Sequence, residues 1–69
     1  MTDQQKIDLA IYLNENMADR SALRKKGFIV ENEVWAQGKF SHYTGYIPDP
    51  AHPTEPLARI KYDRTVIIK

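Results

Sequence analysis

Few residues of this chain could bind a metal ion or activate a nucleophile. His42, Asp49 and His52 are the candidate transition-metal ligands, yet their spacing matches neither the i, i+4 pattern of a helix nor a hairpin ligand pattern. Ser41 adjoins His42, but neighbouring side chains on a strand point to opposite faces, so the two cannot form a nucleophile–base pair. We therefore expect no metal, no cofactor and no catalytic residue, and a protein that is not an enzyme.

Basic residues that could contact phosphates occur in two stretches. The first ends the helical region and the second lies in a late strand: Arg20, Arg24, Lys25 and Lys26, then Arg59 and Lys61. Cations that neutralise phosphates release counterions, and this favours nucleic-acid binding. The same cations also suit the negative end of a helix without any ligand. A formal net charge of +1 argues against strong non-specific binding to nucleic acid.

Aromatic residues are concentrated in a predicted hairpin that contains Trp35, Phe40, Tyr43 and Tyr46. Strand alternation predicts Phe40, His42 and Tyr46 on one face and Tyr43 on the other. So many rings are more than a core of this size easily hides, and we expect some of them to be exposed. Exposed rings can stack on bases or anchor a protein partner, whereas buried rings would simply belong to the core.

The length and composition limit the chain to one small domain. Sixty-nine residues enclose a single hydrophobic core. Because there is no cysteine, neither a disulfide nor a thiolate metal site can stabilise it, so packing or self-association must. The polar start does not resemble a signal peptide, and no stretch approaches the roughly 18 apolar residues of a membrane span. We expect a soluble, cytoplasmic protein. Both a monomer and a homodimer are compatible with the sequence.

The elements that would position these residues begin with a helical region, residues 1–27. Thr2 can cap a first helix with Gln5 completing a capping box. The apolar residues fall in one broad stripe at helical spacing: Ile7, Ala10, Ile11, Leu13 and Met17, with Leu9 and Tyr12 at its margins. A bend near Met17 to Asp19 leads to a short second helix, capped by Asp19 or Ser21, which Gly27 ends.

The rest of the chain predicts strands and one long loop. Residues 28–47 form a β-hairpin region with its turn at Gln37–Lys39 and a turn or bulge at Glu31–Asn32. Residues 48–56 hold all four prolines and must be a loop. Residues 57–69 alternate as a strand that either bends or turns at 62–65.

These elements predict an α+β domain spanning residues 1–69. The N-terminal helix and the short second helix pack on a small antiparallel sheet of three to five strands, with a partial barrel as the main variant. A helix-turn-helix module is the competing interpretation, but the second helix is too short to serve as a recognition helix.

The functional hypothesis is a small non-catalytic protein-binding module: an inhibitor, an adaptor or a regulatory subunit. Alternating acidic and basic segments suit a protein partner better than uniform phosphate. The residues expected to bind it are Arg20, Arg24, Lys25, Trp35, Tyr43 and Tyr46. The alternative is a DNA- or RNA-binding regulatory protein that uses Arg20, Arg24, Lys25, Lys26, Arg59 and Lys61 with an aromatic residue of the hairpin.

Overall fold

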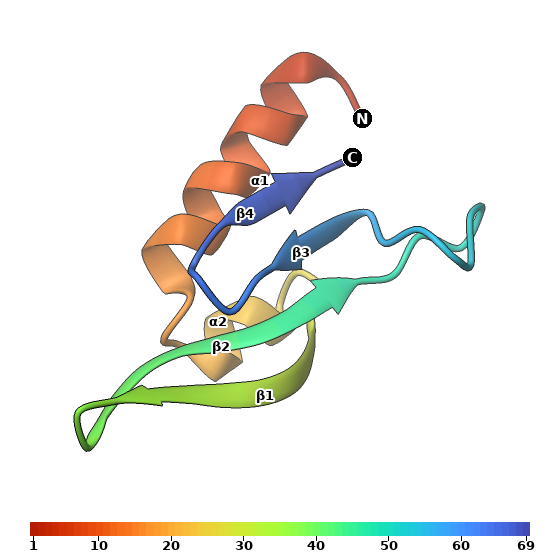
Figure 1. The fold of residues 1–69 in the computed structure, drawn as a ribbon. Helices are drawn as coiled ribbons and strands as arrows, with labels where there is room; N and C mark the ends of the chain where they lie inside the picture. Colours follow the sequence, from red (N-terminus) through yellow and green to blue (C-terminus); the bar gives the residue numbers. More distant parts are fainter.

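Two helices precede four strands along the chain (Figure 1). The computed structural model describes all 69 residues, and the elements are α1 (Asp3–Asn16), α2 (Arg20–Arg24), β1 (Ile29–Ala36), β2 (Lys39–Ile47), β3 (Ala58–Ile60) and β4 (Val66–Ile68). The strands form one antiparallel sheet in the order β1-β2-β3-β4. The α+β prediction is confirmed, and the sheet is open rather than closed into a barrel.

The predicted helix ends are confirmed because the caps are local. The Thr2 hydroxyl accepts a hydrogen bond from the Gln5 amide, and the Gln5 side chain accepts one from the Thr2 amide, which completes the capping box. The Asp19 carboxylate accepts from the Ala22 amide at the start of α2. Gly27, just past α2, has φ +78°, a conformation that glycine adopts without steric cost.

Both helices cover the same face of the sheet. The side chains that meet them form one core, and its buried members are Leu13, Met17, Leu23, Phe28, Ile47, Ala58 and Ile60. We call the sheet surface beneath the helices the helix face and the opposite surface the open face. Register places Ile29, Tyr46, Arg59 and Ile67 in one row across the open face, because directly paired residues point the same way.

The predicted apolar stripe of α1 is wrong in its position around the helix. Leu13 and Met17 are buried and Leu9 is partly buried against the core, whereas Ile7 and Ile11 are about half exposed. The stripe that packs therefore runs through Leu9, Leu13 and Met17. It faces this way because the Tyr12 hydroxyl donates to the Ala22 carbonyl of α2 and fixes the rotation of α1.

Two irregularities change the faces predicted for the long hairpin. Register shifts between Val30 and Asn32, so Glu31 is a bulge within one continuous strand, as one of the predicted alternatives had it. A second shift lies in β2, because Val34 pairs with His42 and Trp35 pairs with Phe40, which leaves Ser41 without a partner. This shift places Phe40 on the helix face with Tyr43, so the prediction that it shares a face with Tyr46 is wrong.

The remaining connections are a two-residue turn, the Pro-rich loop and a tight turn. Gln37 and Gly38 both have positive φ, as expected of the two-residue turn that joins β1 and β2. The Lys61 amide donates to the Thr65 carbonyl and closes the turn between β3 and β4, the second of the two predicted alternatives. Neither helix has the length and apolar character needed to cross a membrane.

Candidate protein-binding surface

The free end of the β1–β2 hairpin projects beyond the helices and the shorter strands (Figure 1). Its outermost large side chain is Trp35, which remains 57% exposed. The ring of Trp35 meets Phe40 edge to face, with centroids 5.6 Å apart, and Phe40 in turn contacts Tyr43 at 4.7 Å. Tyr43 packs against the core. A continuous row of three rings therefore links an exposed indole to the interior.

The indole is held in place on its polar side as well. Trp35 Nε1 donates to Glu33 Oε1 at 3.3 Å, and the two residues share one face of β1. An edge-to-face ring pair contributes about 0.5–1.5 kcal/mol beyond its buried area. These contacts limit the rotamers of Trp35 before any partner arrives.

Tyr46 lies on the open face, away from this aromatic row. The Arg59 guanidinium lies over its ring, 5.4 Å from the centroid, and Arg59 Nη1 donates to Glu31 Oε1 at 3.0 Å. The bulge at Glu31 brings that carboxylate into reach. Arg59 is thus already matched to one acid and one ring within the chain.

The basic residues predicted to act together are distributed over separate parts of the surface. Arg20 and Arg24 line a hollow of about 250 Å³ together with Phe28, Ile29 and Val30. Lys25 caps the C-terminal end of α2, where its positive charge suits the helix terminus.

Lys26 and Arg59 belong to two other hollows. The Lys26 ammonium lies over the Tyr12 ring at 4.8 Å and lines a hollow of about 450 Å³ beside the first half of α1. Arg59 lines one of about 300 Å³ next to Ile67 and Lys69. Lys61 lies outside β3 and is exposed, and none of the three hollows includes it. Arg59 nevertheless lies close to the Arg20–Arg24 hollow, because it bonds to Glu31, and the neighbouring Val30 lines that hollow.

The predicted anchor and the predicted steering charges lie at opposite ends of β1. Ile29 borders the Arg20–Arg24 hollow, and Trp35 lies six residues further along the strand, about 20 Å away at the rise of an extended chain. Tyr43 and Tyr46 point to opposite faces of β2. The structure does not unite the six predicted partner-binding residues on one surface.

The residues considered for chemistry form two pairs, Ser41 with His42 and Asp49 with His52. His42 is only 1% exposed, and its ring contacts the Ser41 hydroxyl at 2.9 Å and the Lys61 carbonyl at 3.2 Å. The prediction that strand alternation holds Ser41 and His42 apart is therefore wrong, because the register shift at Ser41 breaks that alternation. The other ring nitrogen of His42 links β2 to Lys61, just after β3. No three histidine, aspartate or glutamate side chains lie close enough together to hold a metal ion.

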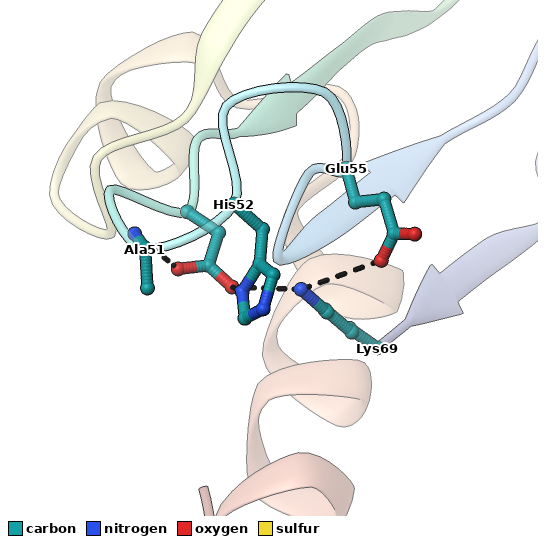
Figure 2. Close-up of polar contacts among 5 residues, drawn as sticks. Ala51, His52, Glu55 and Lys69 are labelled. Atoms are coloured by element: carbon teal, nitrogen blue, oxygen red, sulfur yellow. Dashed lines mark hydrogen bonds and ion pairs between the residues drawn. The ribbon is translucent and has the colours of Figure 1, made fainter.

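Asp49 organises the Pro-rich loop through the contacts drawn in Figure 2. Its carboxylate accepts hydrogen bonds from Lys69 Nζ at 3.1 Å and from the Ala51 amide at 3.0 Å, and it lies 3.3 Å from His52 Nδ1. Lys69 also pairs with Glu55 Oε2 at 3.4 Å. The hydrogen bond from Lys69, then that from Ala51, lowers the pKa of Asp49 below its ordinary value. The loop is tied to the end of β4 and does not form a second ligand site.

Sequence reasoning missed a further set of exposed apolar side chains. Ile7, Ile11 and Ile67 are each about half exposed. The helical spacing predicts Ile7 and Ile11 within the core stripe, which is wrong, and the sequence makes no prediction for the exposure of Ile67. A signal was present, because Ile7 and Ile11 lie about 160° around the helix from Leu9 and Leu13 at 100° per residue, so the two pairs cannot both face the sheet.

Comparison of the chain with family models, with curated proteins and with solved structures gives no match.

Proposed function

We propose that this chain is a non-catalytic protein-binding module, an inhibitor, adaptor or regulatory subunit, which anchors its partner through Trp35. The observation that carries the proposal is an exposed indole whose ring is already fixed by Phe40 and Glu33. Tryptophan is enriched among the residues that dominate binding energy at protein interfaces. Because Phe40 and Glu33 already contact the ring in the free protein, docking it should cost less conformational entropy than docking a ring without such contacts.

The other residues of the predicted surface have supporting roles in this proposal. Tyr43 holds Phe40 against the core and so keeps the aromatic row rigid. Arg20, Arg24 and Lys25 act on the approach of an acidic partner, since charges far from the contact mainly affect association rates. Tyr46, beneath Arg59, belongs to a partner only if that partner also covers the open face. The cytoplasmic location stays a prediction, compatible with a chain that has no cysteine.

Nucleic-acid binding is the alternative, and it is disfavoured because two of the cations that it needs already have partners within the chain. A backbone of regularly spaced phosphates is best matched by a continuous basic track. Here Arg59 pairs with Glu31, Lys26 lies over Tyr12, and the Arg20–Arg24 pair lines a third place on the surface.

The test is quantitative affinity capture from the native host with three immobilised forms of the chain. We expect a partner that the wild type and Tyr62→Ala retain and Trp35→Ala loses by at least about tenfold, a change of 1.4 kcal/mol. Tyr62 is the matched control because its side chain is 75% exposed and its ring contacts neither another aromatic ring nor a cation. A partner captured equally by all three forms would contradict an anchor at Trp35.

A second measurement separates the two functions. Fluorescence anisotropy of labelled DNA and RNA at about 50 and 200 mM salt detects phosphate binding by its steep salt dependence. We expect no binding at the lower salt concentration. Affinity that falls steeply with salt and falls further in Arg24→Ala would favour the nucleic-acid alternative.

A further inference from the structure

The outer edge of β4 is open, and its hydrogen-bonding groups can be assigned from the ladder. The Lys69 amide donates to the Leu57 carbonyl, and the Lys61 amide donates to the Thr65 carbonyl. Because hydrogen-bonded pairs alternate in an antiparallel ladder, Ile67 bonds inward to Arg59. The amides and carbonyls of the two flanking residues, Val66 and Ile68, therefore point away from the sheet, where no fifth strand lies.

Helix α1 lies next to this edge. Among the strands, α1 packs mainly against β4, while α2 packs near β1 at the opposite edge (Figure 1). Tyr12 marks the side of α1 that faces α2. At 100° per residue, Ile7 and Ile11 lie about 160° around α1 from Leu9 and Leu13, so they point away from the sheet. Both are about half exposed.

We propose that β4 pairs with β4 of a second copy of this chain, giving a symmetric dimer with a continuous eight-stranded sheet. An antiparallel register centred on Ile67 sets Val66 opposite Ile68 of the second copy, and the reverse. Each of these two pairs brings together two outward amides and two outward carbonyls, which form two hydrogen bonds. The interface therefore contains about four backbone hydrogen bonds. The two copies of Ile67 meet at the axis, where side chains of a non-hydrogen-bonded pair lie closest.

The side chains are complementary in this register. Every pair within β4 is apolar, and just outside it Thr65 faces Lys69, so no like charges meet. The two α1 helices lie on the same face of the joined sheet. The two-fold axis requires a surface that matches itself, and this one does.

The exposed area of the chain is slightly above the average for its mass. A folded monomer of this mass exposes about 4,450 Å² on the general scaling of area with mass, whereas this chain exposes 4805 Å². The chain also lacks disulfides, and its core cluster has seven buried residues. Small domains without a staple commonly gain stability by association.

The edge of β1 has the opposite character and does not support the same pairing. It carries a bulge at Glu31 and a second acid at Glu33. Bulges and charges are the devices by which sheet edges avoid other strands. The proposed dimer therefore uses β4 alone, and it does not depend on a partner at Trp35, which lies on the long hairpin at the other side of the sheet.

Sedimentation equilibrium of the untagged chain from about 1 to 500 µM tests the dimer over the range expected of a small interface. We expect the apparent mass to rise with concentration from 8.0 kDa toward twice that value. A mass that stays at 8.0 kDa at the highest concentration would overturn the proposal.

Cysteine crosslinking tests the position of the axis. The chain has no cysteine, so Ile67→Cys introduces one thiol. The Cα atoms of a non-hydrogen-bonded pair lie about 4.5 Å apart, within the range that a disulfide spans. Ile29→Cys is the matched control, since Ile29 is 46% exposed and Ile67 47% on the same open face. We expect rapid crosslinking of Ile67→Cys alone, and equal rates for the two variants would overturn the proposed axis.

A charge variant tests the energetics. Ile67→Glu places a carboxylate near Arg59 and Lys69 in the monomer, which suits the fold, but brings two carboxylates together at the axis. We expect the dimer to weaken at least about tenfold, with unchanged circular dichroism, while Ile29→Glu leaves the dissociation constant within about twofold. Equal effects of the two variants would also contradict the proposal.

Discussion

The β1–β2 hairpin and the β3–β4 hairpin share one sheet but present different chemistry. The strands of the first have eight and nine residues, and they extend past the helices to display Trp35. The strands of the second have three residues each, and α1 packs on β4. The long hairpin therefore offers side chains, while the short hairpin offers backbone groups along an uncharged edge. One small sheet can provide two kinds of contact when its two ends differ in length and charge.

Gly45 lies where the two hairpins meet in the sheet. Its replacement should cause the largest loss of unfolding free energy. In β2 it pairs with Val30 on one side and Ile60 on the other. A Cβ there would overlap the Ile29 carbonyl and come within 2.8 Å of Phe28 Cε1. We expect Gly45→Ala to lose more than about 4 kcal/mol of unfolding free energy, as overpacking against backbone does.

Urea titration followed by circular dichroism measures this loss. Gly38→Ala is the control, because its Cβ meets no atom within 4 Å although φ is +76°. It should cost only about 1–2 kcal/mol from the left-handed conformation. A wild-type midpoint for Gly45→Ala would show that β1 and β2 do not approach as closely as described.

The next largest effect is expected from truncating a buried side chain of the short hairpin, compared with an exposed one of the long hairpin. Ile60 in β3 is 1% exposed, and truncation leaves a cavity beneath the helices. We expect Ile60→Ala to cost about 3 kcal/mol, whereas Ile29→Ala at the start of β1 should cost less than about 1 kcal/mol. Equal midpoints in thermal denaturation would contradict this difference between the two hairpins.

A smaller effect is expected at His42, the polar link from the long hairpin to the short one. Removing the ring leaves the Lys61 carbonyl without its contact and opens a small void. We expect His42→Ala to lose about 2 kcal/mol, typical of a buried polar group and its partner. His52→Ala is the control because that ring is exposed. Equal stability of the two variants would mean that the hairpins are held together without His42.

The smallest effect concerns the loop that joins the two hairpins and depends on pH. Lys69 and the Ala51 amide lower the pKa of Asp49 in the folded state. The stabilisation is therefore complete above the ordinary aspartate pKa of about 4 and is lost as pH falls through the lowered folded value. We expect Asp49→Asn to be less stable than the wild type at pH 7 and to lose less stability on acidification.

Melting temperatures at pH 7 and at about pH 2 measure this difference. Glu15→Gln is the control, since no hydrogen bond or ion pair involves its carboxylate. A wild-type acid dependence for Asp49→Asn would show that the Lys69 contact does not persist in solution.

Local features of this fold could be predicted from the sequence, and features set by distant neighbours could not. The capping box at Thr2, the stop at Gly27 and the turn at Gln37–Gly38 each depend on residues within a few positions. The rotation of α1 depends on Tyr12 reaching α2. Side-chain spacing alone could not show which of several apolar residues would face the sheet.

The candidate site was predicted in its parts but not in its arrangement. Trp35 is exposed, as expected for some of the aromatic residues. The register shift at Ser41 places Phe40 on the same face as Tyr43. Strand alternation alone cannot predict such a shift. The basic residues are close in sequence or in one predicted strand, yet Arg20 and Arg24 share one hollow, Lys26 and Arg59 line two others, and Lys25 and Lys61 line none.

Trp35 is the only tryptophan of the chain, and its position makes intrinsic fluorescence selective. A half-exposed indole already emits near the wavelength of an unfolded chain, so its spectrum should change little on denaturation. Burial in an apolar pocket would shift the emission to the blue and shield it from iodide quenching. The chain therefore carries an optical reporter that responds to docking at the hairpin more strongly than to loss of the core.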